Sequence, residues 1–133
     1  ACIRLGRASV KHGVISCLEN MPDLDDFYGR DPYEVDGFVD GIDGMRLILD
    51  IGHANTTGNL KEFLKIVLPK AYHMHIHDNH GRKDEHLPLG QGSINWDKVM
   101  PEIVKNYKGK IIVVEGRNPE EGKTSLNFLK RWF

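Results

Sequence analysis

The sequence has 133 residues, 40% of them hydrophobic and 28% charged, which is typical of a folded globular chain and excludes an intrinsically disordered one. A formal net charge of -1 gives no overall positive field that would attract nucleic acid or an anionic membrane. No apolar run approaches the ~18 residues that would indicate a membrane-spanning helix.

Short apolar runs alternate with helical patterns along the chain. The first residues read as a helix that stops at Gly13. The predicted strands cover residues 14–18, 45–50, 71–77 and 110–115. Apolar residues at helical spacing follow each strand, in residues 32–43, 59–67, 95–108 and 118–132. The residues expected to cap these helices are Asp31, Asn59, Asn95 and Asn118. The alternation predicts an α/β fold of parallel strands covered by helices.

Each predicted strand ends in an acidic residue or carries histidine. Glu19 follows the first strand, Asp50 ends the second, His75 lies in the third and Glu115 ends the fourth. The carboxyl ends of parallel strands lie along one edge of a sheet, so we expect these four side chains to converge. Three carboxylates and one imidazole suit Mn²⁺, Co²⁺, Mg²⁺ or Zn²⁺. The sequence therefore predicts a divalent metal site at this edge.

Residues 71–92 hold five of the seven histidines. Strand alternation places His73, His75 and His77 on one face, away from the covering helices. We favour His75 as the metal ligand. We expect His73 to be a hydrogen-bonded core residue, and His77 either to support the ligands or to be exposed. The glycine-containing turn at residues 90–92 has the composition of an anion cradle.

Four motifs together resemble the superfamily of xylose isomerase-like TIM barrels, which contains sugar-phosphate isomerases and epimerases and also endonuclease IV. The motifs are LEN (residues 18–20), LDIGHAN (49–55), HIHDNHGRKDEHLPLGQGSINW (75–96) and VVEG (113–116). The resemblance implies the C-terminal half of a TIM barrel, strands five to eight. Residues 1–133 would then form a single (β/α)4 half-barrel domain, truncated or fragmentary relative to the ~250 residues of a full barrel.

In the isomerase and epimerase branch, the resemblance implies one divalent metal, Mn, Co, Mg or Zn, held by Glu19, Asp50, His75 and Glu115. Glu19 and Glu115 would also act as acid and base. They would move a proton next to a carbonyl through a metal-stabilised enediolate. His53 and Arg82 would contact the substrate, a sugar or sugar phosphate.

Two alternatives stay open. The endonuclease IV branch carries a trinuclear zinc site and cleaves DNA at abasic sites, and it implies that His53, Asp84 and His86 hold a second metal or contact substrate. That branch also needs two histidines from the first half of the barrel, and the near-neutral charge does not favour DNA. The other alternative is an inactive half-barrel that only binds metal. We favour the isomerase or epimerase.

Assembly and location follow from less specific features. Cys2 and Cys17 are the only cysteines and lack CxxC spacing. Cys17 lies in an apolar run, so we expect it to be a small residue of the core. Unpaired cysteines of this kind favour a reduced, cytoplasmic setting. A sheet of four strands has two open edges. We therefore expect copies of the chain to form a homo-oligomer, in which they either complete a closed barrel-like sheet or cover each other's edges. Missing sequence that completes the barrel would remove this need. Neither a membrane nor nucleic acid is an expected partner.

Overall fold

The fold is built on a parallel four-stranded sheet. The computed structural model describes all 133 residues. The strands are β1 (Ser16–Glu19), β2 (Met45–Asp50), β3 (Ala71–Ile76) and β4 (Ile111–Val114), arranged in the order β1-β2-β3-β4. Every neighbouring pair is parallel. The predicted α/β class with parallel strands is therefore confirmed, and each predicted strand is present.

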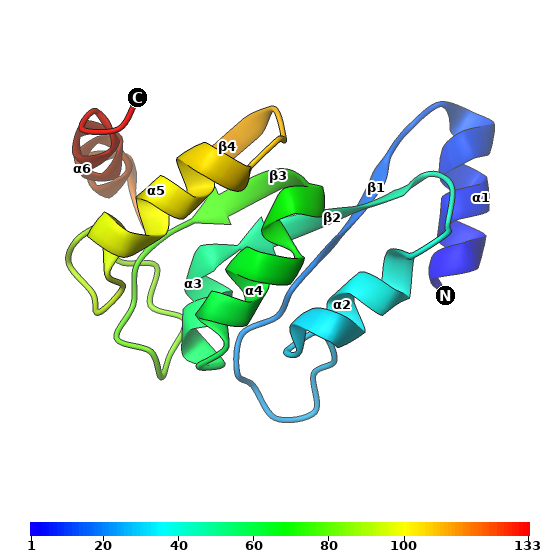
Figure 1. The fold of residues 1–133 in the computed structure, drawn as a ribbon, viewed down its shortest axis with the longest axis horizontal. Helices are drawn as coiled ribbons and strands as arrows, with labels where there is room; N and C mark the ends of the chain where they lie inside the picture. Colours follow the sequence, from blue (N-terminus) through cyan, green and yellow to red (C-terminus); the bar gives the residue numbers. More distant parts are fainter.

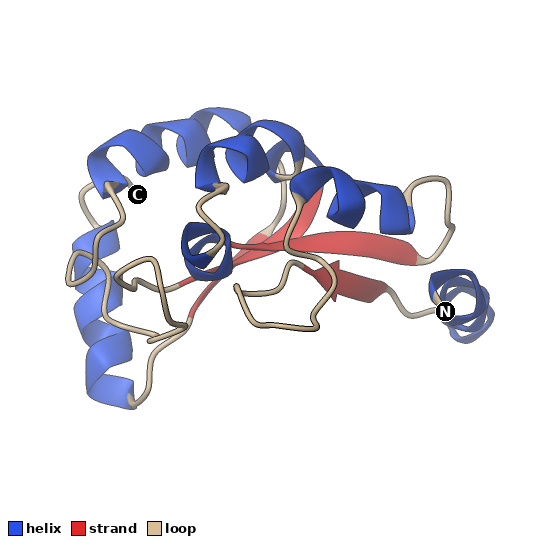
Figure 2. Cartoon of the chain, turned by 90° about the horizontal axis from the view of Figure 1, so that it is seen from below, coloured by secondary structure: helices blue, strands red, loops and turns tan.

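Helices connect the strands. They are α1 (Cys2–His12), α2 (Pro32–Val39), α3 (Ile51–Thr56), α4 (Leu60–Ile66), α5 (Trp96–Asn106) and α6 (Pro119–Leu129), with a short 3-10 helix η1 (Leu68–Lys70) before β3. Helices α2, α4 and α5 lie side by side across the sheet (Figure 1), and the view turned by 90° shows a helical layer along one face of it (Figure 2). None of the helices combines the length and apolar character needed to cross a membrane.

The core lies between the sheet and this helical layer. Met74 and Ile76 of β3 are buried there, whereas the alternate residues His73 and His75 are only partly buried. The neighbouring strand β4 has Ile111 and Val113 in register with the two histidines, and these side chains are exposed. The face of the sheet opposite the helices therefore stays partly open. Cys17, predicted in the core, is only partly buried because β1 is an edge strand.

Three of the four predicted helix caps are confirmed. Side-chain oxygens of Asp31, Asn95 and Asn118 accept hydrogen bonds from backbone N–H groups in the first turns of α2, α5 and α6. Asn59 does occupy the N-cap position of α4, as predicted, but its side chain makes no capping hydrogen bond. Its φ of -104° and ψ of 17° lie outside the extended region from which an N-cap side chain reaches the helix.

Helix bounds differ from the prediction in two places. Helix α2 ends at Val39, before residue 43, and Gly41 then adopts a left-handed φ of 66° that turns the chain out of the helix. Helix α3 was not predicted. It follows β2 without a loop because Asp50, the last strand residue, is also its N-cap: the Oδ1 atom of Asp50 accepts a hydrogen bond from the backbone N–H of His53 (2.7 Å).

Asp78 organises the long loop between β3 and α5. Its fully buried carboxylate accepts hydrogen bonds from four donors, which are the backbone N–H groups of Asn79, Gly90 and Ile94 and the indole N–H of Trp96. Its backbone exchanges two hydrogen bonds of 2.8 Å with that of Leu87. A Cβ at Gly92 would collide with the Asp78 carboxylate. The turn predicted to cradle an anion thus holds a carboxylate of the same chain.

Replacing this carboxylate should destabilise the whole domain. Asp78→Ala leaves four donors without their acceptor, so we expect the free energy of unfolding to fall by at least about 3 kcal/mol. Urea denaturation measures the change. Asp25→Ala, at an exposed aspartate, is the matched control and should change stability by less than about 0.5 kcal/mol. Equal effects of the two substitutions would contradict the organising role of Asp78.

Candidate metal centre

Glu19, Asp50, His75 and Glu115 lie together at the carboxyl edge of the sheet. The Nδ1 atom of His75 is 3.1 Å from Oε1 of Glu19, 2.9 Å from Oε1 of Glu115 and 4.0 Å from Oδ2 of Asp50. The Asp50 side chain is fully buried, while those of the two glutamates are 28% exposed. Carboxylates from three strands therefore converge on one imidazole, with access from the open face.

Asn20 holds the ends of β1 and β2 in register. Its buried side-chain amide donates a hydrogen bond to the backbone oxygen of Asp50 (2.9 Å), and its Oδ1 atom accepts one from the backbone N–H of Asp50 (2.8 Å). The side chain thus continues the strand pairing one step beyond Glu19. The sequence pattern assigned no role to Asn20, although a polar residue directly after a strand is a signal of such a contact.

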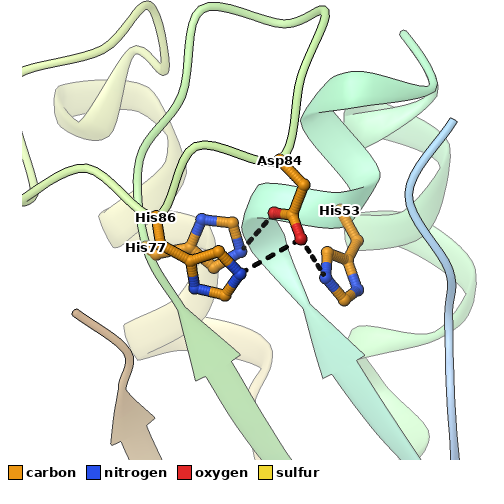
Figure 3. A group of neighbouring side chains, drawn as sticks. All are labelled: His53, His77, Asp84 and His86. Carbon is orange, nitrogen blue, oxygen red and sulfur yellow. Dashed lines mark hydrogen bonds and ion pairs between the residues drawn. The ribbon is translucent and has the colours of Figure 1, made fainter. Parts of the chain in front are cut away.

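His53, Asp84 and His86 also come together, and His77 joins them (Figure 3). The Oδ2 atom of Asp84 lies 3.3 Å from Nε2 of His53 and 3.1 Å from Nε2 of His86. Its Oδ1 atom lies 3.3 Å from Nε2 of His77. The ligand atoms of all four residues lie within 4.8 Å of one another. We expected His77 either to support the metal ligands or to be exposed. The second alternative is wrong, because the ring is completely buried.

The two clusters form one network. Three contacts join them: His77 Nε2 to Asp50 Oδ1 at 3.2 Å, His86 Nδ1 to Glu115 Oε2 at 3.3 Å, and His53 Nδ1 to Glu19 Oε1 at 3.6 Å. Each of these histidines therefore contacts a carboxylate of the first cluster as well as Asp84. A change of charge in one cluster acts directly on the other.

The carboxylates favour positively charged imidazoles. Burial lowers the pKa of His53, but the hydrogen bond with Asp84 and the charge of Asp50 raise it more, so that the pKa reaches about 9. For Asp84, burial raises the pKa, but the surrounding histidines lower it to about 2. The hydrogen bond with Glu19 raises the pKa of His75 against the effect of burial. The site therefore holds concentrated negative charge that requires cationic partners.

Three buried polar atoms of the network have no hydrogen-bond partner: Asp50 Oδ2, His77 Nε2 and Asp84 Oδ1. A buried polar atom left unpaired is destabilising by about 1–3 kcal/mol, so three in one region require an explanation. Carboxylate oxygens and imidazole nitrogens are ligands of divalent cations. Coordination to a cation would satisfy these atoms, and the residues therefore fit a divalent metal.

Two other predicted positions lie outside the network. His73, expected to be a hydrogen-bonded core residue, is only partly buried and makes no side-chain hydrogen bond, because it lies on the open face of β3; that prediction is wrong. Arg82, predicted to contact substrate, is exposed on the loop and forms no ion pair. Its role stays a prediction.

The fold and the site together define a parallel α/β protein with a candidate metal site at the carboxyl edge of its sheet. Residues 4–132 match the family described as xylose isomerase-like TIM barrel, and the chain belongs to this family.

Two relatives come from Methanocaldococcus jannaschii. The uncharacterized protein MJ1614 is 33% identical over 126 residues, which cover 95% of this chain and 49% of that protein. The uncharacterized protein MJ1311 is 36% identical over 126 residues, covering 91% of this chain and 43% of that protein. The chain therefore spans about half the length of the curated relatives it matches.

Solved structures show the same arrangement. A D-tagatose 3-epimerase-like protein superposes with a TM-score of 0.85 at 32% identity, over 96% of this chain and 50% of that one. The IolI protein with a bound zinc atom gives a TM-score of 0.78 at 23% identity, over 98% and 54% of the two chains. The apo 3-keto-D-glucoside 4-epimerase YcjR of E. coli gives a TM-score of 0.74 at 23% identity, over 96% of this chain and 50% of that one. The fold is that of half a TIM barrel, as predicted.

Gly52 leaves room for the His77 ring, which a Cβ at this position would strike. We expect Gly52→Ala to lower the free energy of unfolding by about 1–3 kcal/mol, because the buried ring has no space to move. Gly122→Ala, at another helical glycine with open space around it, is the control. It should leave stability unchanged or raise it by up to about 1 kcal/mol. Thermal unfolding of both variants tests the difference, which should vanish if His77 is free to shift.

Proposed function

We propose that the protein is a divalent-metal-dependent isomerase or epimerase that acts on a sugar or sugar phosphate. The observation that carries this proposal is the pair of carboxylates, Glu19 and Glu115, that contact the His75 ring from strands on either side of it. Similarity at 32% identity to a D-tagatose 3-epimerase-like protein supports the substrate class.

Glu19, Asp50, His75 and Glu115 would hold the metal. Three carboxylates and one imidazole suit Mn²⁺, Co²⁺, Mg²⁺ or Zn²⁺. When bound, such a cation polarises a substrate carbonyl and stabilises the negative charge that develops on its oxygen. The orphaned Oδ2 atom of Asp50 supports this assignment, because it is a buried charged oxygen with no donor of its own.

The two glutamates have the chemistry needed to transfer a proton at the carbon beside a carbonyl. Glu19 uses Oε1 for its contacts with His75 and His53, and its Oε2 atom has no partner that would prevent it from taking a proton. Glu115 contacts His75 through Oε1 and His86 through Oε2. One carboxylate would act as base and the other as acid. His53 and Arg82 would contact the substrate hydroxyl or phosphate groups.

A second candidate function is zinc-dependent cleavage of DNA at abasic sites. The grouping of His53, Asp84 and His86 into a second set of ligands favours it. The net charge of -1 does not. Parallel assays with ketose sugars and with a duplex containing one abasic site separate the two functions. Activity on neither substrate would support a half-barrel that only binds metal.

Loss of one carboxylate should abolish sugar turnover. We expect Glu115→Gln to lower kcat by about 10²–10⁴-fold while leaving the fold intact, because the amide cannot accept a proton. Elemental analysis of the unmodified protein should find manganese or cobalt, and chelation should remove activity. Glu62→Gln, an exposed glutamate on α4, is the control and should retain full activity. Retention of activity by Glu115→Gln would refute the acid–base assignment.

We also propose that a second copy covers the edges of the sheet. Strands β1 and β4 have no partner on their outer sides, and the apolar side chains of Val14, Ile15 and Ile111 are exposed beside them. Unpaired edges of this kind associate readily.

Light scattering of the 133-residue chain should therefore detect a dimer or larger species at high concentration. Ile111→Lys places a charge beside the β4 edge and should shift the species toward the monomer. A purely monomeric chain at high concentration would contradict the proposal.

A further inference from the structure

We propose that the groove between α4 and α5 binds the loop between β1 and α2 of a second copy of the chain, and that two copies exchange this contact reciprocally. The inference goes beyond the proposed function, because it concerns neither the metal site nor the edges of the sheet. It rests on two neighbouring surfaces of the chain that carry opposite charge and both contain apolar side chains.

The groove between α4 and α5 combines apolar side chains with a basic rim. It encloses about 790 Å³, which lies in the range of binding clefts in proteins. Its apolar lining includes Leu60, Leu64 and Val99, and the lysines beside them are Lys61, Lys65 and Lys98. Only Lys70 and Lys123 form lysine ion pairs within the chain, so the lysines of the groove have no acidic partner. The one carboxylate of the lining, Glu102, accepts a hydrogen bond from Asn106 (2.8 Å). The groove therefore fits an acidic segment with apolar side chains.

The loop between β1 and α2 is a segment of this kind. Its aromatic side chains lie exposed to solvent, Phe27 to 47% and Tyr28 to 77%. The carboxylates that line the same surface are Asp23, Asp26, Asp31 and Glu34, and its only basic residue is Arg30. Aromatic side chains of this type often contribute most of the binding energy of a protein interface. The loop thus offers apolar anchors surrounded by negative charge, which complements the groove.

The two surfaces adjoin at the start of α4. Asn59 lines the acidic surface, and the next two residues, Leu60 and Lys61, line the groove. The backbone N–H of Asp23 donates a hydrogen bond to Oγ1 of Thr56 (2.9 Å), which holds the loop at this position. Figure 1 shows the loop and the start of α4 at the same end of the molecule. A two-fold axis close to this point would lay the loop of each copy on the groove of the other.

The adjoining surfaces favour a second copy over an unrelated partner. Every contact of a two-fold dimer occurs twice, so a chain with acidic and basic surfaces side by side is complementary to itself. An unrelated acidic protein would fill the groove but leave the aromatic loop exposed, whereas a second copy covers both surfaces. Burial of Phe27 and Tyr28 would hold the copies together, and the charges would orient them.

Sedimentation analysis of the Ile111→Lys variant tests this contact separately from pairing of the sheet edges. The substitution weakens association through β4 and leaves the groove intact, so we expect a dimer to persist. Salt screens charges at the rim of an interface, so raising NaCl from about 0.05 M to about 1 M should raise the dissociation constant about 10-fold or more. A monomer at every concentration, or a dissociation constant that salt leaves unchanged, would overturn the proposal. This measurement changes neither surface and does not depend on the folding of a further variant.

Two charge-reversed variants test which surfaces meet. The groove variant carries Lys61→Glu and Lys98→Glu, which lie in the first turns of α4 and α5, where glutamate is favourable for the helix. The loop variant combines Asp23→Lys and Asp25→Lys with Asp26→Asn. Asparagine is chosen for the third position because Asp26 has a φ of 64°, which asparagine tolerates better than lysine does. Both variants are therefore expected to fold, and circular dichroism verifies this.

The variants are compared in the Ile111→Lys background. Each alone should be a monomer at concentrations where that parent is a dimer, because loop and groove then carry charge of the same sign. An equimolar mixture should form a heterodimer, since each loop then meets a groove of opposite charge. Lys123→Glu with Lys130→Glu, at exposed lysines outside both surfaces, is the control and should dimerise like the parent. Undiminished dimerisation of either folded variant alone, or a mixture of folded variants that stays monomeric, would overturn the proposal.

Discussion

The buried carboxylate of Asp50 is the constraint around which the rest of the site is arranged. Its Oδ1 atom starts α3 by capping the N–H of His53 and also faces His77, while its Oδ2 atom points to His75 without a donor. Asn20 fixes its backbone from the neighbouring strand. A fully buried charge is strongly destabilising unless it is compensated. The histidines collected around Asp50, and the metal they imply, provide that compensation.

Comparison with Asp78 shows what distinguishes a ligand from a structural residue. Both carboxylates are completely buried at the carboxyl edge of the sheet. Asp78 accepts four hydrogen bonds and therefore has no free oxygen for a cation. Asp50 keeps one oxygen unpaired. The protein thus uses one aspartate to hold the loop that carries Asp84 and His86, and leaves the other available. Hydrogen-bond satisfaction, rather than residue type or burial, separates the two roles.

Features that depend on local patterns could be predicted from the sequence, and those that depend on distant contacts could not. Apolar runs predicted all four strands. Because the carboxyl ends of parallel strands share one edge of a sheet, the prediction also placed Glu19 and Glu115 at the same edge without any knowledge of the loops. Helix α3 was missed because six residues are too few for a periodic pattern. The place of His77 was missed because β3 ends at residue 76, so strand alternation no longer applied. The role of Asp78 depends on donors 12–18 residues away, which no local pattern reveals.

The contacts between the clusters imply that they do not act independently. His86 lies against Asp84 through Nε2 and against Glu115 through Nδ1. The contact with Asp84 orients this ring so that Nδ1 is directed at the Glu115 carboxylate. The carboxylate proposed to transfer a proton is therefore contacted by a histidine that the loop between β3 and α5 carries. The hydrogen bonds of Asp78 that hold this loop in place therefore also fix the position of a group that contacts the proposed catalytic carboxylate.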